Sequence, residues 1–110
     1  MTMSPQVAVA RITREMKALE DAIDLVLARK NALVAEFTQA RIDLQASAHS
    51  GHVAMMRLAN VEKFAMSARA DAIRAHEDLY QLGRERGDLP MEKPPEGSLQ
   101  RFEAATAQAA

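Results

Sequence analysis

The side chains with the clearest potential for chemistry are the three histidines, His49, His52 and His76. His49 and His52 are separated by two residues, a spacing that suits some metal sites, but the stretch around them offers neither a cysteine nor an acid as a further ligand. None of the three has a glutamate three residues before it, so the Glu-x-x-His pattern of di-iron bundles is absent. We therefore predict no metal site, and we interpret His76, which precedes Glu77 and Asp78, as an ordinary surface or edge residue.

The motifs that organise common active sites are also missing from the sequence. It has no phosphate-binding glycine loop, no Gly-x-Ser-x-Gly turn and no His-Glu-x-x-His helix. The chain contains no cysteine, which excludes disulfides, thiolate catalysis and cysteine-bound zinc. Its carboxylates stand three or four residues from basic residues, as in exposed helical ion pairs, and paired catalytic acids would need a cleft. We expect a protein that is not an enzyme and that binds no cofactor.

The charge pattern argues against nucleic acid as a partner. The 110 residues carry a net charge of −1, and basic residues alternate with acidic ones along the chain. A nucleic-acid footprint needs clustered positive charge. The best candidate is the line of Arg57, Lys63, Arg69 and Arg74, and acids are interspersed along it. Nucleic-acid binding is therefore the least favoured of the functions considered.

The first half of the chain predicts one long helix, over about residues 5–48. Ser4 can cap its free amides, and Pro5 suits the first helical position. Apolar residues then recur at alternating spacings of three and four, which is a heptad pattern typical of helices that pack along their length. Lys30 interrupts the pattern, and we expect its ammonium group to reach water, Asp24 or Glu36. The two heptad lines are Val9, Met16, Ile23, Phe37 and Leu44, and Ile12, Leu19, Val26, Leu33 and Ala40, while Leu27 and Val34 form a second stripe that indicates a bundle.

A second helix is predicted over about residues 52–84, after a connection near Gly51. Serine, histidine and glycine are weak helix formers, and they cluster between residues 47 and 52. The heptad phase nevertheless continues through Gly51, so a single uninterrupted helix is the alternative to a hairpin. We favour the hairpin, because glycine and serine would make a poor centre for a coiled coil. The second helix continues the heptad in smaller residues, namely Ala54, Leu58, Val61, Ala65, Ala68, Ala72, Ala75, Leu79 and Leu82.

The predicted helices differ in length, which points to a partner. The first should extend beyond the second at its N-terminal end by about 20 Å, at roughly 1.5 Å per residue. The overhang would carry Val9, Ile12 and Met16, and exposed apolar surface of this kind is usually covered. The fold class predicted for residues 1–87 is therefore all-α: a long hairpin of two antiparallel helices that forms a four-helix bundle or a coiled-coil-like homodimer.

Residues 88–110 differ in composition from the hairpin. Pro90, Pro94 and Pro95 favour an extended path, and Ser98 could cap a short last helix. We expect a proline-rich tail that is either free, folded back on the hairpin, or used as a short binding arm.

The sequence thus favours a protein-binding role. We expect a non-enzymatic regulator, such as an inhibitor or anti-activator, that binds a partner protein, for example a transcription factor, through its helices. A structural, assembly or chaperone-like accessory protein of the phage type is the alternative. With no apolar run approaching the ~18 residues of a membrane helix, and no signal peptide, we expect a soluble cytoplasmic protein. The predicted protein interface comprises Val9, Ile12, Met16, Leu19, Ile23, Met55, Met66, Ile73, Tyr80, Leu99 and Phe102.

Overall fold

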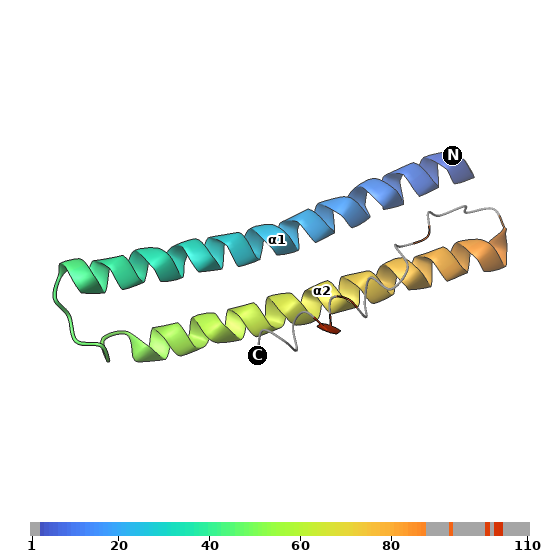
Figure 1. Ribbon diagram of the computed structural model, residues 1–110. Coiled ribbons are helices and arrows are strands. Elements are labelled where there is room, and N and C mark those ends of the chain that lie inside the picture. Colours follow the sequence, from blue (N-terminus) through green and yellow to red (C-terminus); the bar gives the residue numbers. More distant parts are fainter. Residues whose placement is uncertain (1–2, 88–92, 94–100, 102, 105–110) are drawn as a thin grey trace.

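The computed structural model consists of two long helices that pack against each other, and it describes residues 3–87, 93, 101, 103 and 104 (Figure 1). Helix α1 runs from Pro5 to Asp43 and helix α2 from His52 to Arg86. The chain reverses direction between them, so the helices are antiparallel and the alternative of one uninterrupted helix does not apply. The predicted tail, residues 88–110, lies outside the described residues apart from four positions.

Local signals explain where the helices begin and end. The Ser4 hydroxyl accepts a hydrogen bond from the Val7 amide at 3.2 Å, and Pro5 occupies the first turn, where its missing N–H costs nothing. Helix α2 ends at Arg86, and Gly87 follows in the left-handed conformation with φ 75°. The Gly87 amide donates to the Gly83 carbonyl at 2.9 Å, which closes the last turn.

Helix α1 ends five residues earlier than the sequence suggested, at Asp43 rather than about residue 48. The Gln45 amide donates to the Ile42 carbonyl at 3.1 Å and the Ala46 amide to the Arg41 carbonyl at 3.0 Å, which together form a Schellman motif. Gln45 adopts φ 53°, a left-handed conformation that this motif requires and that usually selects glycine. The composition gave no warning of this stop, because no glycine or asparagine marks it.

The expected N-terminal overhang is absent. Helix α1 has 39 residues and α2 has 35, and the two end nearly level beside the N-terminus of α1 (Figure 1). Because α1 stops early and α2 continues beyond residue 84, the predicted difference in length disappears. Val9, Ile12 and Met16 therefore lie alongside α2 and are partly buried. The prediction of an uncovered helix end was wrong.

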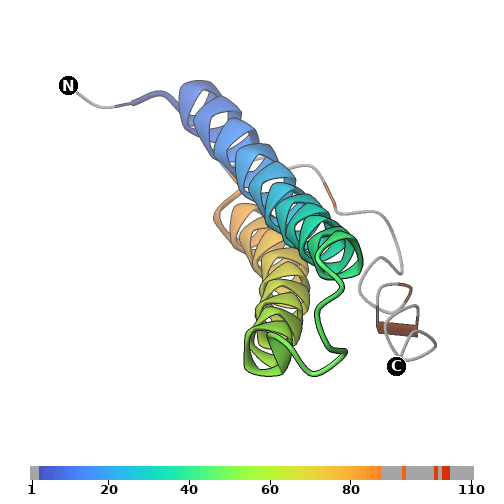
Figure 2. The same cartoon turned by 90° about the vertical axis from the view of Figure 1, so that its left-hand side faces the viewer.

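The helices touch along their length and cross obliquely (Figure 2). The buried hydrophobic residues of the described chain are Ile23, Ala65 and Ala72, with exposed fractions of 8%, 7% and 5%. Small residues at the centre of α2 let the two backbones approach closely, as the alanine-rich pattern of this helix indicated. The core is nevertheless small for a chain of this length.

The face that α1 presents to α2 differs from the predicted heptad pair. One predicted line, which contains Ile23 and Phe37, does turn toward α2. The other, which contains Leu19 and Val26, does not, and the line of Leu27 and Val34 takes its place. The residues of α1 that are buried or half-buried at heptad spacing are Val9, Met16, Ile23, Lys30 and Phe37, together with Glu20, Leu27, Val34 and Arg41.

Polar contacts between the helices accompany this rotation. Asp24 pairs with Arg69, and His76 Nδ1 lies 3.8 Å from Glu20 Oε1. Both contacts lie where the polar edge of α1 turns toward α2, with Leu19 and Val26 turned away from it. In the part of the chain that the structure describes, no helix is long and apolar enough to cross a membrane.

Candidate protein-binding surface

The line of α1 that the hairpin leaves open is made of large apolar side chains. Leu19, Val26 and Leu33 have exposed fractions of 50%, 47% and 54%. They recur every seven residues, so they lie on one side of the helix. Ile12, half-buried, and Ala40, exposed, extend the line at its two ends.

Helix α2 carries a corresponding line of smaller residues. Val61 and Leu82 are both exposed large hydrophobic residues, and alanines occupy the positions between and before them. Phe64 lies beside this line and is 75% exposed, although aromatic rings usually bury a large area. The complete line, exposed at every position, is Ala54, Val61, Ala68, Ala75 and Leu82.

Two apolar hollows show that the lines share one face of the hairpin. Near the connection, a hollow of about 310 Å³ brings Leu33 of α1 beside Ala54 and Leu58 of α2. At the other end, a hollow of about 440 Å³ joins Ile12 and Leu19 of α1 to Leu79 of α2. We call this side the uncovered face, and it comprises Ile12, Leu19, Val26, Leu33 and Ala40 of α1 with Ala54, Val61, Ala68, Ala75 and Leu82 of α2.

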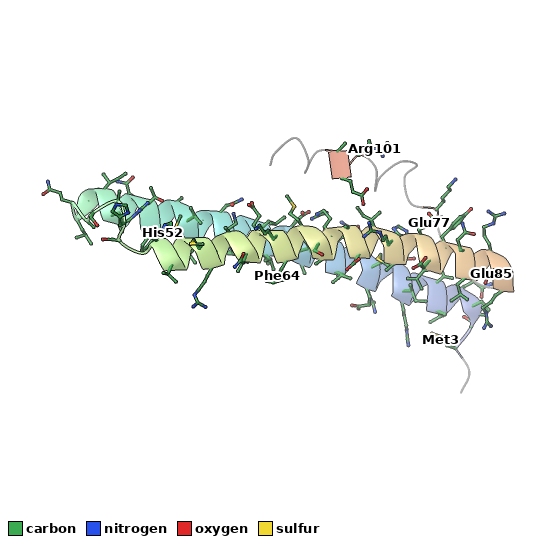
Figure 3. The ribbon with its side chains drawn as sticks, turned by 90° about the horizontal axis from the view of Figure 1, so that it is seen from below. Met3, His52, Phe64, Glu77, Glu85 and Arg101 are labelled. Atoms are coloured by element: carbon green, nitrogen blue, oxygen red, sulfur yellow. The ribbon has the colours of Figure 1, made fainter. Side chains whose placement is uncertain are left out.

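The other side of the hairpin is polar on α1. Asp24, which pairs with Arg69, precedes Val26 by two residues, or about 200° of helical rotation. On α2, Arg74 pairs with Glu103 at 2.8 Å. Figure 3 shows Phe64 pointing away from the side of α2 on which Glu77 and Arg101 lie. The uncovered face is therefore apolar along both helices and these ion pairs lie on another side, although exposed apolar residues outside the face include Leu25, Ile42, Val53 and Met56.

The predicted interface residues separate into several groups. Only Leu19 and Ile12 belong to the uncovered face. Val9, Met16 and Ile23 turn toward α2 and contribute to the hairpin itself, and half-buried Met55 lines the hollow beside Leu33. Met66, Ile73 and Tyr80, which repeat every seven residues on another side of α2, are half-buried, and Leu99 and Phe102 lie outside the described residues.

Sequence reasoning missed most of the uncovered face because it placed two apolar lines of each helix in one seam. Val26, Leu33, Val61 and Leu82 were all recognised as heptad residues, but they were assigned to the inner contact. The useful signal was the third line, Leu27 and Val34. Three adjacent apolar lines cover more of a helix than one neighbouring helix can bury.

Lys30 pairs with neither of the acids suggested by the sequence. Its Nζ lies 3.1 Å from Glu62 Oε1 on the other helix, and its side chain is only 10% exposed. The long stem packs at the helix–helix contact, and the ammonium group finds its counter-ion across it. This pair joins the hairpin and leaves the uncovered face free of charge at that level.

No metal-binding cluster is found in the part of the chain that the structure describes. Within residues 3–87 and the four described tail positions, no group of three or more histidine, aspartate or glutamate side chains could hold a metal ion. The basic line is also partly neutralised, since Arg69 pairs with Asp24 and Arg74 with Asp71 and Glu103. The uncovered face is the most extensive feature that awaits an explanation.

No protein-family model matches the chain, and no curated protein or solved structure is significantly similar to it.

Proposed function

We propose that the protein is a non-enzymatic regulator that binds a partner protein through its helices. The observation that supports the proposal is the uncovered face, which runs along both helices at heptad spacing. Contiguous apolar patches of more than a few hundred Å² on a soluble chain usually mark a site of interaction. An amphipathic helix of the partner would fit along the shallow line between α1 and α2, with its own apolar residues at i, i+3, i+4 and i+7.

The mode of action would be competition for helix surface. A protein that offers two parallel apolar lines resembles half of a helical bundle, and it can replace the missing half of another protein's dimerisation surface. An inhibitor or anti-activator of a dimeric protein, such as a transcription factor, would work in this way. The partner's recognition surface should then be apolar and helical.

A structural or assembly role is the second candidate, and the same face favours it. A four-helix bundle or coiled-coil-like homodimer would bury the open lines of both helices at once. In that case the bundle itself is the product, and higher oligomers are expected.

Capture of the partner from the producing cells tests the proposal, with one variant on each side of the hairpin. Val26→Glu places a charge at the centre of the uncovered face, and Asn31→Glu places the same charge on the polar side of the same helix. We expect the wild type and Asn31→Glu to retain a stoichiometric partner whose cross-links map to residues 12–40 and 54–82. Val26→Glu should lose it, and equal capture by all three proteins would overturn the proposal.

A further inference from the structure

We infer that the uncovered face is occupied by a second copy of this chain, with the two-fold axis parallel to the helices and both connections at the same end. This arrangement sets α1 of one copy on α2 of the other. The inference rests on the second candidate function above, because it names a second copy of the chain as the occupant of the uncovered face. It goes further by fixing the orientation of the two hairpins.

The size of the face matches what a stable dimer needs. From Ile12 to Ala40 the open line of α1 is about 42 Å long, at roughly 1.5 Å per residue. Two helices that pack about 9 Å apart present a surface about 18 Å wide. The product is about 750 Å² per copy, close to the roughly 800 Å² that each partner contributes to a standard stable interface.

The volumes of the side chains at the centre of the uncovered face favour a two-fold axis parallel to the helices. The ion pairs between the helices place Lys30 level with Glu62 and Glu20 level with His76. The same antiparallel register puts Leu19 level with Ala75, and Val26 with Ala68. With the two-fold axis parallel to the helices, Leu19 would face the partner's Ala75 and Val26 would face the partner's Ala68, so the two central layers set a large residue against a small one. Nearer the ends, Leu33 would face the partner's Val61 and Ile12 would face the partner's Leu82.

The perpendicular axis fits less well. It would stack α1 on α1 and α2 on α2, so that at the centre of the face Val26 meets the partner's Val26 and Leu19 meets the partner's Leu33, while Ala68 meets the partner's Ala68. Well-packed bundles alternate large and small residues across facing positions, because native packing density leaves few voids. The perpendicular arrangement would need one pair of helices to stand further apart than the other.

Charges beside the uncovered face agree with the parallel axis. Glu36 and Arg57 flank the face near the connection, on opposite outer edges of one hairpin. In the proposed dimer Glu36 lies beside Arg57 of the partner subunit. Arg29 comes level with Phe64 of the partner subunit, where a guanidinium can cover the exposed ring. The perpendicular axis, centred at Val26, would bring Glu15 beside Glu36 of the partner subunit, and these like charges repel.

One pair opposes the proposed dimer and thereby provides a test. Glu15 comes level with Asp78 of the partner subunit, and both are acidic. Glu15→Lys should therefore tighten the dimer about three-fold, since an exposed pair contributes on the order of 0.5 kcal/mol. In the perpendicular arrangement Glu15→Lys would also relieve repulsion. A second variant is therefore needed to distinguish the parallel from the perpendicular arrangement.

Charge reversal at Glu36 and Arg57 distinguishes the two dimer arrangements. Glu36→Arg alone should weaken the dimer about ten-fold, because it sets two arginines side by side in each of the two symmetry-related contacts. Adding Arg57→Glu to the same chain should restore the affinity. Arg57 also lines the hollow beside Leu33 of its own chain, so rescue supports the contact between copies only together with the distance measured below.

The decisive experiment measures a distance between copies in purified full-length protein. Because the chain has no cysteine, His49→Cys carries a single spin label at the connection. Two labels should lie about 20–30 Å apart when the connections share one end, and beyond about 50 Å when they lie at opposite ends of ~55 Å helices. A distance beyond 50 Å, or a monomer at 100 μM by light scattering, would overturn the inference.

These outcomes stay distinct from failure of the proposed function. A monomer that still captures another protein, and loses it with Val26→Glu, would refute the second copy and leave the proposed function standing. A dimer with the expected distance and no other partner would support the inference and favour the assembly role. Circular dichroism of each variant shows that its helices are intact.

Discussion

At the scale of single residues, the contact between Phe37 and Gly51 fixes the connection to the end of α1. Gly51 has φ 75°, and a Cβ at this position would overlap the ring of Phe37, with Cε1 only 2.7 Å away. Arg41 lies over the same ring at 5.4 Å from its centroid and donates to the Ala48 carbonyl at 2.9 Å. The glycine is therefore required both by its conformation and by the ring above it.

The first prediction compares two glycines of equal conformation. Gly51→Ala should lower the free energy of unfolding by about 2–3 kcal/mol, because the left-handed conformation costs about 1 kcal/mol and the ring must also move. Gly87→Ala, at the same φ of 75° with nothing within 4 Å, should cost only about 1 kcal/mol. Urea unfolding measures both values.

A double-mutant cycle checks the cause. In a Phe37→Ala background the ring is gone, so Gly51→Ala should cost about the same as Gly87→Ala. An unchanged excess cost in that background would contradict the proposed role of Phe37.

The second prediction concerns the partly buried pair of Lys30 and Glu62. Glu62→Ala should destabilise the hairpin by about 1–2 kcal/mol, because it leaves an ammonium group of low exposure without its counter-ion. Lys30→Met should be neutral or stabilising by up to about 1 kcal/mol, since it replaces a desolvated charge with an apolar side chain of similar length.

Thermal melts of both variants test this asymmetry, with an exposed pair as the control. Lys17 and Asp21 lie 3.3 Å apart on the surface of α1, so Lys17→Met should change the stability by less than about 0.5 kcal/mol. If Lys30→Met and Glu62→Ala destabilise equally, the desolvation cost of Lys30 is small and the pair is a net stabiliser.

At the scale of the elements, the third prediction concerns the end of α1. Gln45 holds a left-handed conformation at the position where Schellman motifs usually carry glycine. Gln45→Gly should therefore stabilise the protein by about 0.5–1 kcal/mol. The substitution relieves the strain of the left-handed conformation, and part of this gain is lost because glycine has more conformational freedom in the unfolded chain. Ala28→Gly, at an exposed position inside α1, should instead destabilise it by about 1 kcal/mol. Loss of stability in both variants would show that Gln45 is unstrained.

The elements also show what the sequence could and could not predict. The sequence was enough to predict two helices, the helix start at Ser4 and Pro5, and the reversal before Gly51. Each of these depends on local chemistry and on a heptad pattern. Which apolar line faces inward was not accessible. Adjacent heptad lines differ by only about 50° of rotation, and the choice depends on pairs such as Asp24 with Arg69, which join residues 45 apart.

The same limit applies to the candidate surface. The apolar residues of the uncovered face were identified, but their assignment to the solvent side needed the register between the helices. The stop at Asp43 was likewise hidden, because Gln45 occupies a position where a glycine would have marked it. The hidden stop at Asp43, together with the extension of α2 to Arg86, removes the overhang that the sequence predicted.

At the scale of the whole molecule, the hairpin has too little core to be very stable alone. Ile23, Ala65 and Ala72 are its buried hydrophobic residues among those described, and two of them are alanines. Small domains with little buried area commonly need oligomerisation, a metal or disulfides. With no cysteine, this chain cannot use disulfides, and a second copy on the uncovered face would supply the missing burial.

The fourth prediction follows if the hairpin gains much of its stability by associating with a second copy. If the folded state is a dimer, the melting temperature must rise with protein concentration. A tenfold increase corresponds to about 1.4 kcal/mol per dimer, which for a chain pair of about 220 residues is a shift of about 4 °C. Val26→Glu should lower the melting temperature and remove its dependence on concentration, whereas Asn31→Glu should do neither. Circular dichroism melts between 1 and 100 μM provide the measurement, and a wild-type melting temperature that stays constant over this range would show that the hairpin is stable without a second copy.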